Sequence, residues 1–195
     1  MDIKGKHIIL GSNSPRRKEL LAGMGFPFDV DTRTGFDENF ATLHDDPATL
    51  PARMSEGKSL GFHRPLSPGE ILITADTLVL CEGEALGKPK DRADAVRMLK
   101  KLSGKPHSVI TAVTLRSLKH SETVSDEAIV YFKELSDDEI NYYVDTFKPF
   151  DKAGAYAIQE WIGFIGIPKI DGSFYTIMGF PVALVYKELL SFIEE

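Results

Sequence analysis

Cysteine is almost absent from this sequence of 195 residues, because Cys81 is the only one. A single cysteine cannot form an internal disulfide, and secreted chains of this size often carry several, so we expect a reducing compartment, the cytoplasm. Long apolar runs are missing as well. The N-terminal sequence MDIKGKHIILGS holds an apolar run too short for the core of a signal peptide, and no stretch approaches a membrane span. We therefore expect neither a targeting signal nor a membrane partner.

The sequence also lacks an excess of positive charge. It has 23 lysines and arginines against 29 aspartates and glutamates, a formal net charge of -6. Nucleic acids and anionic membranes favour a basic surface, and basic residues interleaved with aromatic ones are missing too. We therefore expect no nucleic-acid partner, and any site for an anion has to be local.

Two catalytic patterns are missing. The histidines do not have the spacing of a zinc site, and no serine lies in a nucleophile elbow. Zinc hydrolases and hydrolases with a Ser-His-Asp triad are therefore disfavoured.

The apolar residues alternate between a period of two and a period of 3.6, which predicts a mixed α/β fold. Strands are expected at residues 8–10, 28–31, 70–80, 107–118 and 121–132, the last two forming a hairpin. Helices are expected at residues 15–24, 50–62, 91–102 and 136–146, and from about residue 181. No repeat, low-complexity segment or linker divides the chain, so residues 1–195 are expected to form a single domain.

The stretch GSNSPRRKELL follows the first apolar run and predicts a strand, a turn and a helix. Ser14 suits the helix N-cap and Pro15 the first helical position. Free amides at a helix start favour an anion, and the guanidinium groups of Arg16 and Arg17 match phosphate oxygens. Ser14, Arg16 and Arg17 are therefore candidate phosphate ligands. The alternative is an ordinary cap followed by two solvated arginines.

Asp76 lies inside the apolar strand sequence EILITADTLVL. A carboxylate buried in such a strand is destabilising by several kcal/mol unless it is paired, protonated or bound to metal. Asp76 either makes a local hydrogen bond or arginine pair, or holds a divalent cation or activates water. Its position in mid-strand favours the second interpretation.

Two lysines and an acidic pair complete the candidates for a triphosphate site. Lys88 precedes a predicted helix in the sequence GKPKD, and Lys58 lies within the predicted helix 50–62. Lysines are usually only solvated charges, but these two could converge with the arginines on one triphosphate. Asp37 and Glu38 lie in a polar loop, where such a pair most often faces solvent. This pair would have a role only if it supplied a second carboxylate ligand to a magnesium ion bound to the nucleotide.

The segment DKAGAYAIQ combines small residues with Gln159 at its end. Small residues let the backbone approach a ligand, and a glutamine amide donates and accepts at once. Gln159 is therefore a candidate for reading a nucleotide base. The alternative is a tightly packed strand with Gln159 at its exposed end.

Several segments occur together in the order typical of the Maf family of nucleoside triphosphate pyrophosphatases. They are SNSPRRKELL, ITADTLVL, GKPKDRADAVRMLKKLSGKPHSVITAV, DKAGAYAIQ and KIDGSFYTIMGFP. The chain resembles this family over nearly its whole length. The resemblance implies an elongated mixed sheet flanked by helices, with two lobes around a deep cleft, related to the inosine triphosphate pyrophosphatases. It also implies a homodimer that hydrolyses a nucleoside triphosphate between the α- and β-phosphates, using Mg²⁺ or Mn²⁺, to clear the nucleotide pool.

The resemblance also implies roles for individual residues. Asp76 would be the proton acceptor and a metal ligand, with Glu38 as the second carboxylate on the metal side. The phosphates would be held by Ser14, Arg16, Arg17, Lys58 and Lys88. The surroundings of Lys58 and Glu38, PARMSEGKSLGF and TGFDENF, depart from the alanine-rich helix and acidic loop usual in the family.

Base preference follows from the same resemblance. The sequence is similar to the branch acting on dTTP and UTP, with specificity positions at Arg16, Thr77 and Gln159. Thymine and uracil carry one N–H between two carbonyls, which suits an amide side chain. Glu160 departs from the family, which usually has glycine there. Two alternatives remain: a nucleotide-binding regulator of cell division with little catalysis, or a pyrophosphatase for 7-methyl-GTP or modified pyrimidines, with Glu160 and Trp161 reshaping the base pocket.

Overall fold

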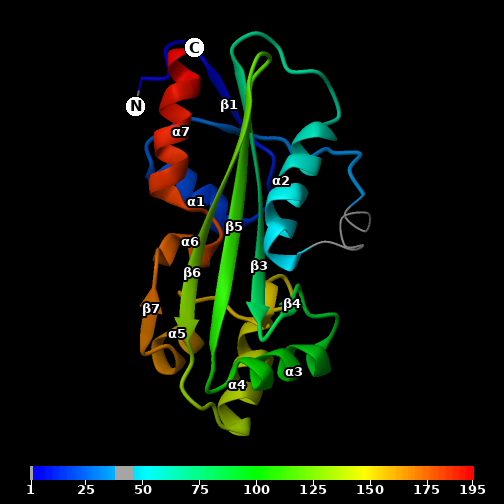
Figure 1. Ribbon diagram of the computed structural model, residues 1–195, viewed down its shortest axis with the longest axis vertical. Coiled ribbons are helices and arrows are strands. Elements are labelled where there is room, and N and C mark those ends of the chain that lie inside the picture. Colours follow the sequence, from blue (N-terminus) through cyan, green and yellow to red (C-terminus); the bar gives the residue numbers. More distant parts are fainter. Residues whose placement is uncertain (1, 38–45) are drawn as a thin grey trace. The chain divides into compact units, whose positions relative to one another are not determined.

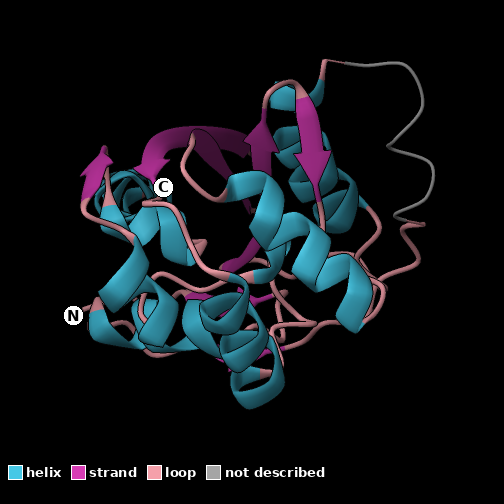
Figure 2. Cartoon of the chain, turned by 90° about the horizontal axis from the view of Figure 1, so that it is seen from below, coloured by secondary structure: helices cyan, strands magenta, loops and turns pink. Residues whose placement is uncertain are grey.

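The computed structural model describes residues 2–37 and 46–195, and in these ranges it shows a seven-stranded mixed sheet flanked by helices (Figures 1 and 2). The sheet order is β2-β1-β3-β5-β6-β7, with β4 paired to β3 off this path. The strands are β1 (His7–Leu10), β2 (Asp29–Val30), β3 (Glu70–Cys81), β4 (Glu84–Leu86), β5 (Pro106–Arg116), β6 (Ser121–Tyr131) and β7 (Lys169–Asp171). The α-helices are α1 (Pro15–Gly23), α2 (Leu50–Leu60), α3 (Arg92–Leu102), α4 (Asp137–Phe147), α5 (Trp161–Gly166), α6 (Phe174–Met178) and α7 (Val182–Glu194).

Strand directions confirm the mixed α/β class. β1 runs parallel to both β2 and β3, with Leu10 opposite Ile73, whereas β3 with β4 and β6 with β7 are antiparallel. The predicted hairpin is also present, because β5 and β6 are neighbours joined by a turn in which the Ser117 N–H donates to the His120 carbonyl at 2.8 Å. β3 continues to Cys81, one residue beyond the predicted end, and after a tight turn β4 begins at Glu84.

Helix starts lie where the capping residues predict them. Ser14 caps α1 with Pro15 in its first turn, and Asp91 caps α3 by accepting from the Asp94 N–H at 2.8 Å. Ser136 and Glu139 form a complete capping box on α4, with bonds of 3.1 and 2.8 Å. These starts were predictable because each is determined by side chains within one turn of the helix.

The chain forms two compact units. The first comprises residues 1–76, 111–126 and 179–195. Its core brings together side chains from β1, α1, β3, β5 and α7, and Leu10, Ile73, Leu189 and Phe192 are at most 1% exposed. Apolar burial on this scale is the main source of folding free energy. The last helix is therefore part of the same core as the first strand.

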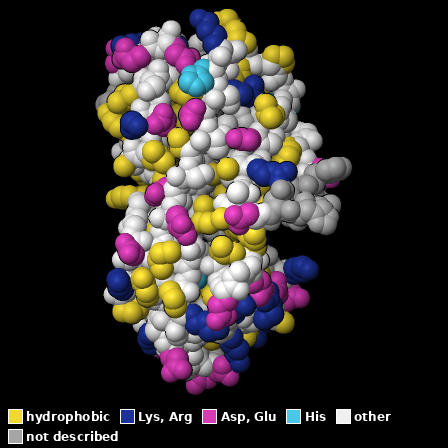
Figure 3. Space-filling model, viewed as in Figure 1, with side chains coloured by type: hydrophobic (Ala, Val, Ile, Leu, Met, Phe, Trp, Pro, Cys, Tyr) yellow, Lys and Arg dark blue, Asp and Glu magenta, His cyan; other side chains and the backbone are white. Residues whose placement is uncertain are grey.

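The second unit comprises residues 77–110 and 127–178, and α3 packs there against α4 and against the short 3₁₀ turn Ala153–Ala155. Charges of both signs alternate on the surface around α3 (Figure 3). Arg92 pairs with Asp145 at 2.7 Å, and Lys101 pairs with Glu84 at 2.9 Å. This surface is therefore mixed in charge. Among the helices of residues 2–37 and 46–195, none has both the length and the apolar character needed to cross a membrane.

Candidate active site

The predicted phosphate turn lies between β1 and α1 in the first unit. Gly11 lets β1 end close to β3, because a Cβ there would lie 2.8 Å from the Thr74 methyl group, and the Gly11 N–H donates to the Ile73 carbonyl at 2.8 Å. The Ser14 Oγ then accepts from the Arg17 N–H at 3.5 Å, and the Ser12 Oγ accepts from the Ser14 N–H at 3.3 Å. The amides of Ser14 and Arg17 are therefore bonded within the turn, and Ser14 caps the helix as predicted.

Arg17 fastens this turn to two distant segments. Its Nε donates to the Gly179 carbonyl at 2.9 Å, and its Nη1 donates to the Ala75 carbonyl at 2.9 Å and the Ser12 Oγ at 3.3 Å. A guanidinium is suited to this because its donors are held in a rigid plane. Arg17 thus sets the position of the turn relative to the residue that precedes Asp76. Arg16 lies partly exposed in the first turn of α1.

Asp76 is paired with Lys58 in the same unit. The Lys58 Nζ lies 2.7 Å from the Asp76 Oδ1, and their side chains are 17% and 24% exposed. The carboxylate is therefore partly exposed rather than buried, which corrects the expectation from its apolar strand. The pairing also shows that the helix position of Lys58 faces β3, as a role beside Asp76 requires. Both groups keep contact with solvent and so remain accessible to a ligand.

The helix that carries Lys58 is held by hydroxyl groups and by one aromatic ring. Ser55 donates to the Thr74 carbonyl at 3.0 Å, and the Thr74 hydroxyl donates back to the Ser55 carbonyl at 2.8 Å. Gly57 makes room for Phe36, because a Cβ there would lie 2.2 Å from the ring. The chain just before Glu38 therefore lies on α2. Glu38 itself is outside the described residues, and its predicted role stays a prediction.

Three sequence motifs meet within the second unit. The Gly154 N–H donates to the Gly87 carbonyl at 3.1 Å, which ties the GKP segment carrying Lys88 to DKAGAY. A Cβ on Gly154 would lie 2.9 Å from a methyl group of Val79, two residues beyond Thr77 on β3. Thr77 is partly exposed and Lys88 is exposed. The motifs that suggested one site in the sequence thus pack against one another here.

The AGAYAI segment is a turn and not the strand that was considered as an alternative. Gly154 and Ala155 have φ angles of +67° and +59°, a left-handed conformation that is uncommon for alanine. Gln159 is also not at an exposed strand end, because its Oε1 is buried and accepts no hydrogen bond from any described residue. A buried polar atom without a partner costs about 1–3 kcal/mol. The described part of the protein therefore leaves the hydrogen bonding of Gln159 incomplete, as it does that of the buried His107 Nδ1.

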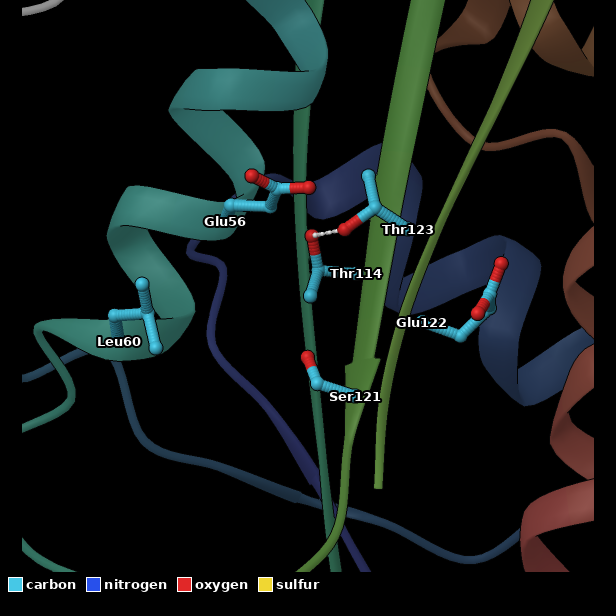
Figure 4. A pocket seen from close by; sticks show the side chains of 6 residues that line it. All are labelled: Glu56, Leu60, Thr114, Ser121, Glu122 and Thr123. Carbon is cyan, nitrogen blue, oxygen red and sulfur yellow. Dashed lines mark hydrogen bonds between the residues drawn. The ribbon is translucent and has the colours of Figure 1, made fainter.

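A pocket of about 360 Å³ lies elsewhere in the first unit (Figure 4). It is lined by Glu56, Leu60, Thr114, Ser121, Glu122 and Thr123. Two of its hydroxyl groups, on Thr114 and Thr123, bond each other at 2.9 Å, and the two glutamates would repel a triphosphate. None of the predicted site residues lines this pocket. It is therefore not the expected phosphate site.

The carboxylates fit a metal that arrives with a nucleotide rather than one held by the protein alone. Within residues 2–37 and 46–195, no group of three or more His, Cys, Asp or Glu side chains could hold a metal ion. Asp76 offers a partly exposed carboxylate whose Oδ1 is the oxygen paired with Lys58. Magnesium bound to a nucleotide needs only one or two protein carboxylates, with phosphate and water as its other ligands. Asp76 meets that requirement.

Sequence reasoning missed two residues of the second unit, Tyr143 and Lys152. Tyr143 is fully buried and Lys152 is 8% exposed. Both contact Glu160. The signal for Lys152 was present, because a lysine among the small residues of DKAGAY has little room to reach solvent. Tyr143 looked like an ordinary core residue of an amphipathic helix.

Comparison with known proteins identifies the family of this chain. A family model described as "Maf-like protein" matches residues 7–192. The chain is 49% identical over 183 residues to a protein of Bacteroides thetaiotaomicron named "dTTP/UTP pyrophosphatase", covering 93% of this chain and 94% of that protein. Proteins with the same name from Christiangramia forsetii and Porphyromonas gingivalis are 48% and 43% identical, covering 96% and 98% of this chain and 94% and 96% of their own lengths. The chain belongs to the Maf family.

Proposed function

We propose that this protein is a nucleoside triphosphate pyrophosphatase that hydrolyses dTTP and UTP to the monophosphate and pyrophosphate. One observation carries the proposal: the Arg17 guanidinium binds the carbonyl of Ala75, so the phosphate turn is fixed beside the strand residue Asp76, which is paired with Lys58. The relatives named dTTP/UTP pyrophosphatase, alike over nearly the whole chain, supply the substrate class.

In this mechanism Asp76 acts as the proton acceptor. Its carboxylate takes a proton from a water molecule, whose oxygen attacks the α-phosphorus as the bond to the bridging oxygen of the β-phosphate breaks. Lys58 orients the Asp76 carboxylate through the 2.7 Å pair. The Ser14 hydroxyl, with the guanidinium groups of Arg16 and Arg17, binds phosphate oxygens and stabilises the charge that leaves with pyrophosphate. Lys88 is proposed to bind the same phosphate chain.

A divalent cation, Mg²⁺ or Mn²⁺, bound by Asp76 and by Glu38 together with the phosphates, would neutralise charge on the phosphate oxygens. Base recognition is proposed for Arg16, Thr77 and Gln159. The buried Oε1 of Gln159 supports this, because the N–H between the two carbonyls of thymine or uracil would supply the donor that this atom lacks. Cytosine has no hydrogen at that ring nitrogen and would leave Oε1 unpaired.

The test is the product formed by the purified protein with magnesium and a panel of nucleoside triphosphates. We expect pyrophosphate and the monophosphate from dTTP and UTP. Asp76→Asn is expected to lower kcat by at least about 100-fold, as for the loss of a general base, while its circular dichroism spectrum is unchanged. Asp138→Asn is the matched control, because Asp138 lies exposed in the first turn of α4. It should retain full activity.

Other products would change the conclusion. Release of orthophosphate, or wild-type activity in Asp76→Asn, would refute the mechanism. Tight binding of a nucleotide without turnover would favour a regulator of cell division, and preference for 7-methyl-GTP in the panel would change the substrate. We also propose that the protein is a cytoplasmic homodimer, which light scattering and cell fractionation can test.

A further inference from the structure

Gln159 is carried by a tight turn, which we call the Gln159 turn (residues 157–160). The Glu160 N–H donates to the Ala157 carbonyl at 3.1 Å and closes the turn, so Gln159 is its third residue. Ala157 and Ile158 are each 6% exposed. The side chain of Gln159 therefore has its direction set by a turn that is packed into the second unit, not by a surface loop.

One phenol group holds both ends of this turn. The Tyr143 hydroxyl accepts from the Ala157 N–H at 3.2 Å and donates to the Glu160 Oε2 in a short hydrogen bond. Tyr143 is fully buried on α4, with its ring stacked on Phe147 at 5.1 Å. Burial and the neighbouring Glu160 raise the pKa of Tyr143, so the hydroxyl keeps its proton and remains a donor.

The other oxygen of the same carboxylate faces a buried ammonium group. The Lys152 Nζ lies 3.4 Å from the Glu160 Oε1 and 2.8 Å from the Asp151 Oδ1, and the Lys152 side chain is 9% exposed. A charge this buried requires a partner, and Glu160 provides one from within the turn. The Glu160 carboxylate is thus held on both oxygens and lies against Lys152 and Tyr143.

The far side of the turn is closed by α5. The Gly163 N–H donates to the Glu160 carbonyl at 2.9 Å. A Cβ on Gly163 would lie 1.8 Å from the Ile158 carbonyl oxygen, so the backbone of α5 touches the backbone of the turn. The turn is held between Tyr143 on one side and α5 on the other. It cannot rotate without breaking these contacts.

We infer that Tyr143, Lys152 and Glu160, here called the brace, are positioning residues that set base specificity by fixing the orientation of Gln159. This inference rests on the proposed function, and it gives Glu160 a role other than reshaping the base pocket. The Gln159 Oε1 is buried and has no donor among the described residues. Its direction is set by a backbone that the brace holds fixed. Specificity arises because a base that lacks an N–H for Oε1 leaves that atom unpaired.

The experiment compares kcat/KM for dTTP and dCTP in wild type, Tyr143→Phe and Glu160→Gln. Tyr143→Phe removes the hydroxyl that holds both ends of the turn, and Glu160→Gln keeps the shape but removes the charge facing Lys152. Each is expected to lower the dTTP to dCTP ratio by about tenfold, the effect of misplacing one oriented hydrogen bond. In a Gln159→Ala background the same changes should leave the ratio unaltered, because the brace acts through Gln159.

Matched controls lie in the same unit. Tyr142→Phe alters an exposed tyrosine adjacent to Tyr143, and Glu139→Gln weakens the α4 capping box and its 2.7 Å pair with Lys133. Both should keep the wild-type ratio, even where urea unfolding shows that Glu139→Gln is less stable. If the brace were merely structural, its variants would keep the wild-type ratio as these controls do. Any loss of activity would then be equal for every nucleotide.

An unchanged dTTP to dCTP ratio in folded Glu160→Gln and Tyr143→Phe would overturn the inference. The inference would also fail if these changes lowered the ratio further in the Gln159→Ala background. If Tyr143→Phe does not fold, the nearly isosteric Glu160→Gln decides. If wild type releases pyrophosphate from no nucleotide, the proposed function fails and the inference fails with it. That outcome is distinguishable because it is seen before any variant is measured.

Discussion

Lowering the pH from 7 to 5 is expected to destabilise this protein through one buried imidazole, His107. The residue is 3% exposed and lies 5.5 Å from the ring centres of both Phe132 and Tyr156. Its Nε2 shares a 2.7 Å hydrogen bond with the Tyr156 hydroxyl. Burial lowers the pKa of His107 from 6.5 to about 4, because the charged ring would lose its hydration.

The direction of the effect follows from proton binding. Between pH 6.5 and 4 the unfolded chain takes up a proton at His107 that the folded chain does not, so the free energy of unfolding falls as the pH drops through this window. The difference in pKa corresponds to a loss of about 2 kcal/mol at pH 5 and about 3 kcal/mol below pH 4. At pH 7 both states are neutral and the loss is absent.

Urea unfolding followed by circular dichroism at pH 7, 6 and 5 measures this loss. His107→Gln can still bond to Tyr156 but does not titrate, so its free energy of unfolding should fall by about 2 kcal/mol less than that of wild type between pH 7 and 5. An equally steep fall in His107→Gln would refute the assignment.

Two further predictions concern the helix under Lys58 and the metal. Gly57→Ala should lower the free energy of unfolding by about 1–3 kcal/mol, because the new Cβ meets Phe36 at 2.2 Å, whereas Gly23→Ala, with no atom within 4 Å, should raise it by up to about 1 kcal/mol. Equal effects of the two changes in urea unfolding would contradict this. Treatment with EDTA should abolish pyrophosphate release from dTTP, and added Mg²⁺ or Mn²⁺ should restore it, with circular dichroism unchanged throughout. Full activity without metal would refute a role for the cation.

Local chemistry explains what could be predicted from the sequence. The starts of α1, α3 and α4 follow from Ser14, Asp91 and Ser136, whose side chains bond to amides within the next turn. The long apolar strand around Asp76 and the β5–β6 hairpin follow from periodicity and from the turn residues. In each case the interacting groups are close together in the sequence, so the pattern alone carried the information.

Contacts between distant segments explain the rest. The Lys58–Asp76 pair joins a helix to a strand, and only its two members could be nominated from the sequence. The sequence could not decide whether the segment after Asp151 forms a strand or a turn, because small residues suit both. The positive φ angle of Ala155 cannot be predicted from the residue types in this segment. The contact between Gly57 and Phe36 could not be predicted either, because Phe36 lies on another segment.

The Arg17 guanidinium has a consequence for how the protein is made. It binds the carbonyl of Gly179, and α7 contributes to the core that contains β1. On the ribosome, the segments bearing the phosphate turn and Asp76 emerge before α7, the helix that buries their apolar neighbours. A nascent chain therefore contains the proposed catalytic groups before it can hold them in place, and the proposed hydrolysis has to await synthesis of α7.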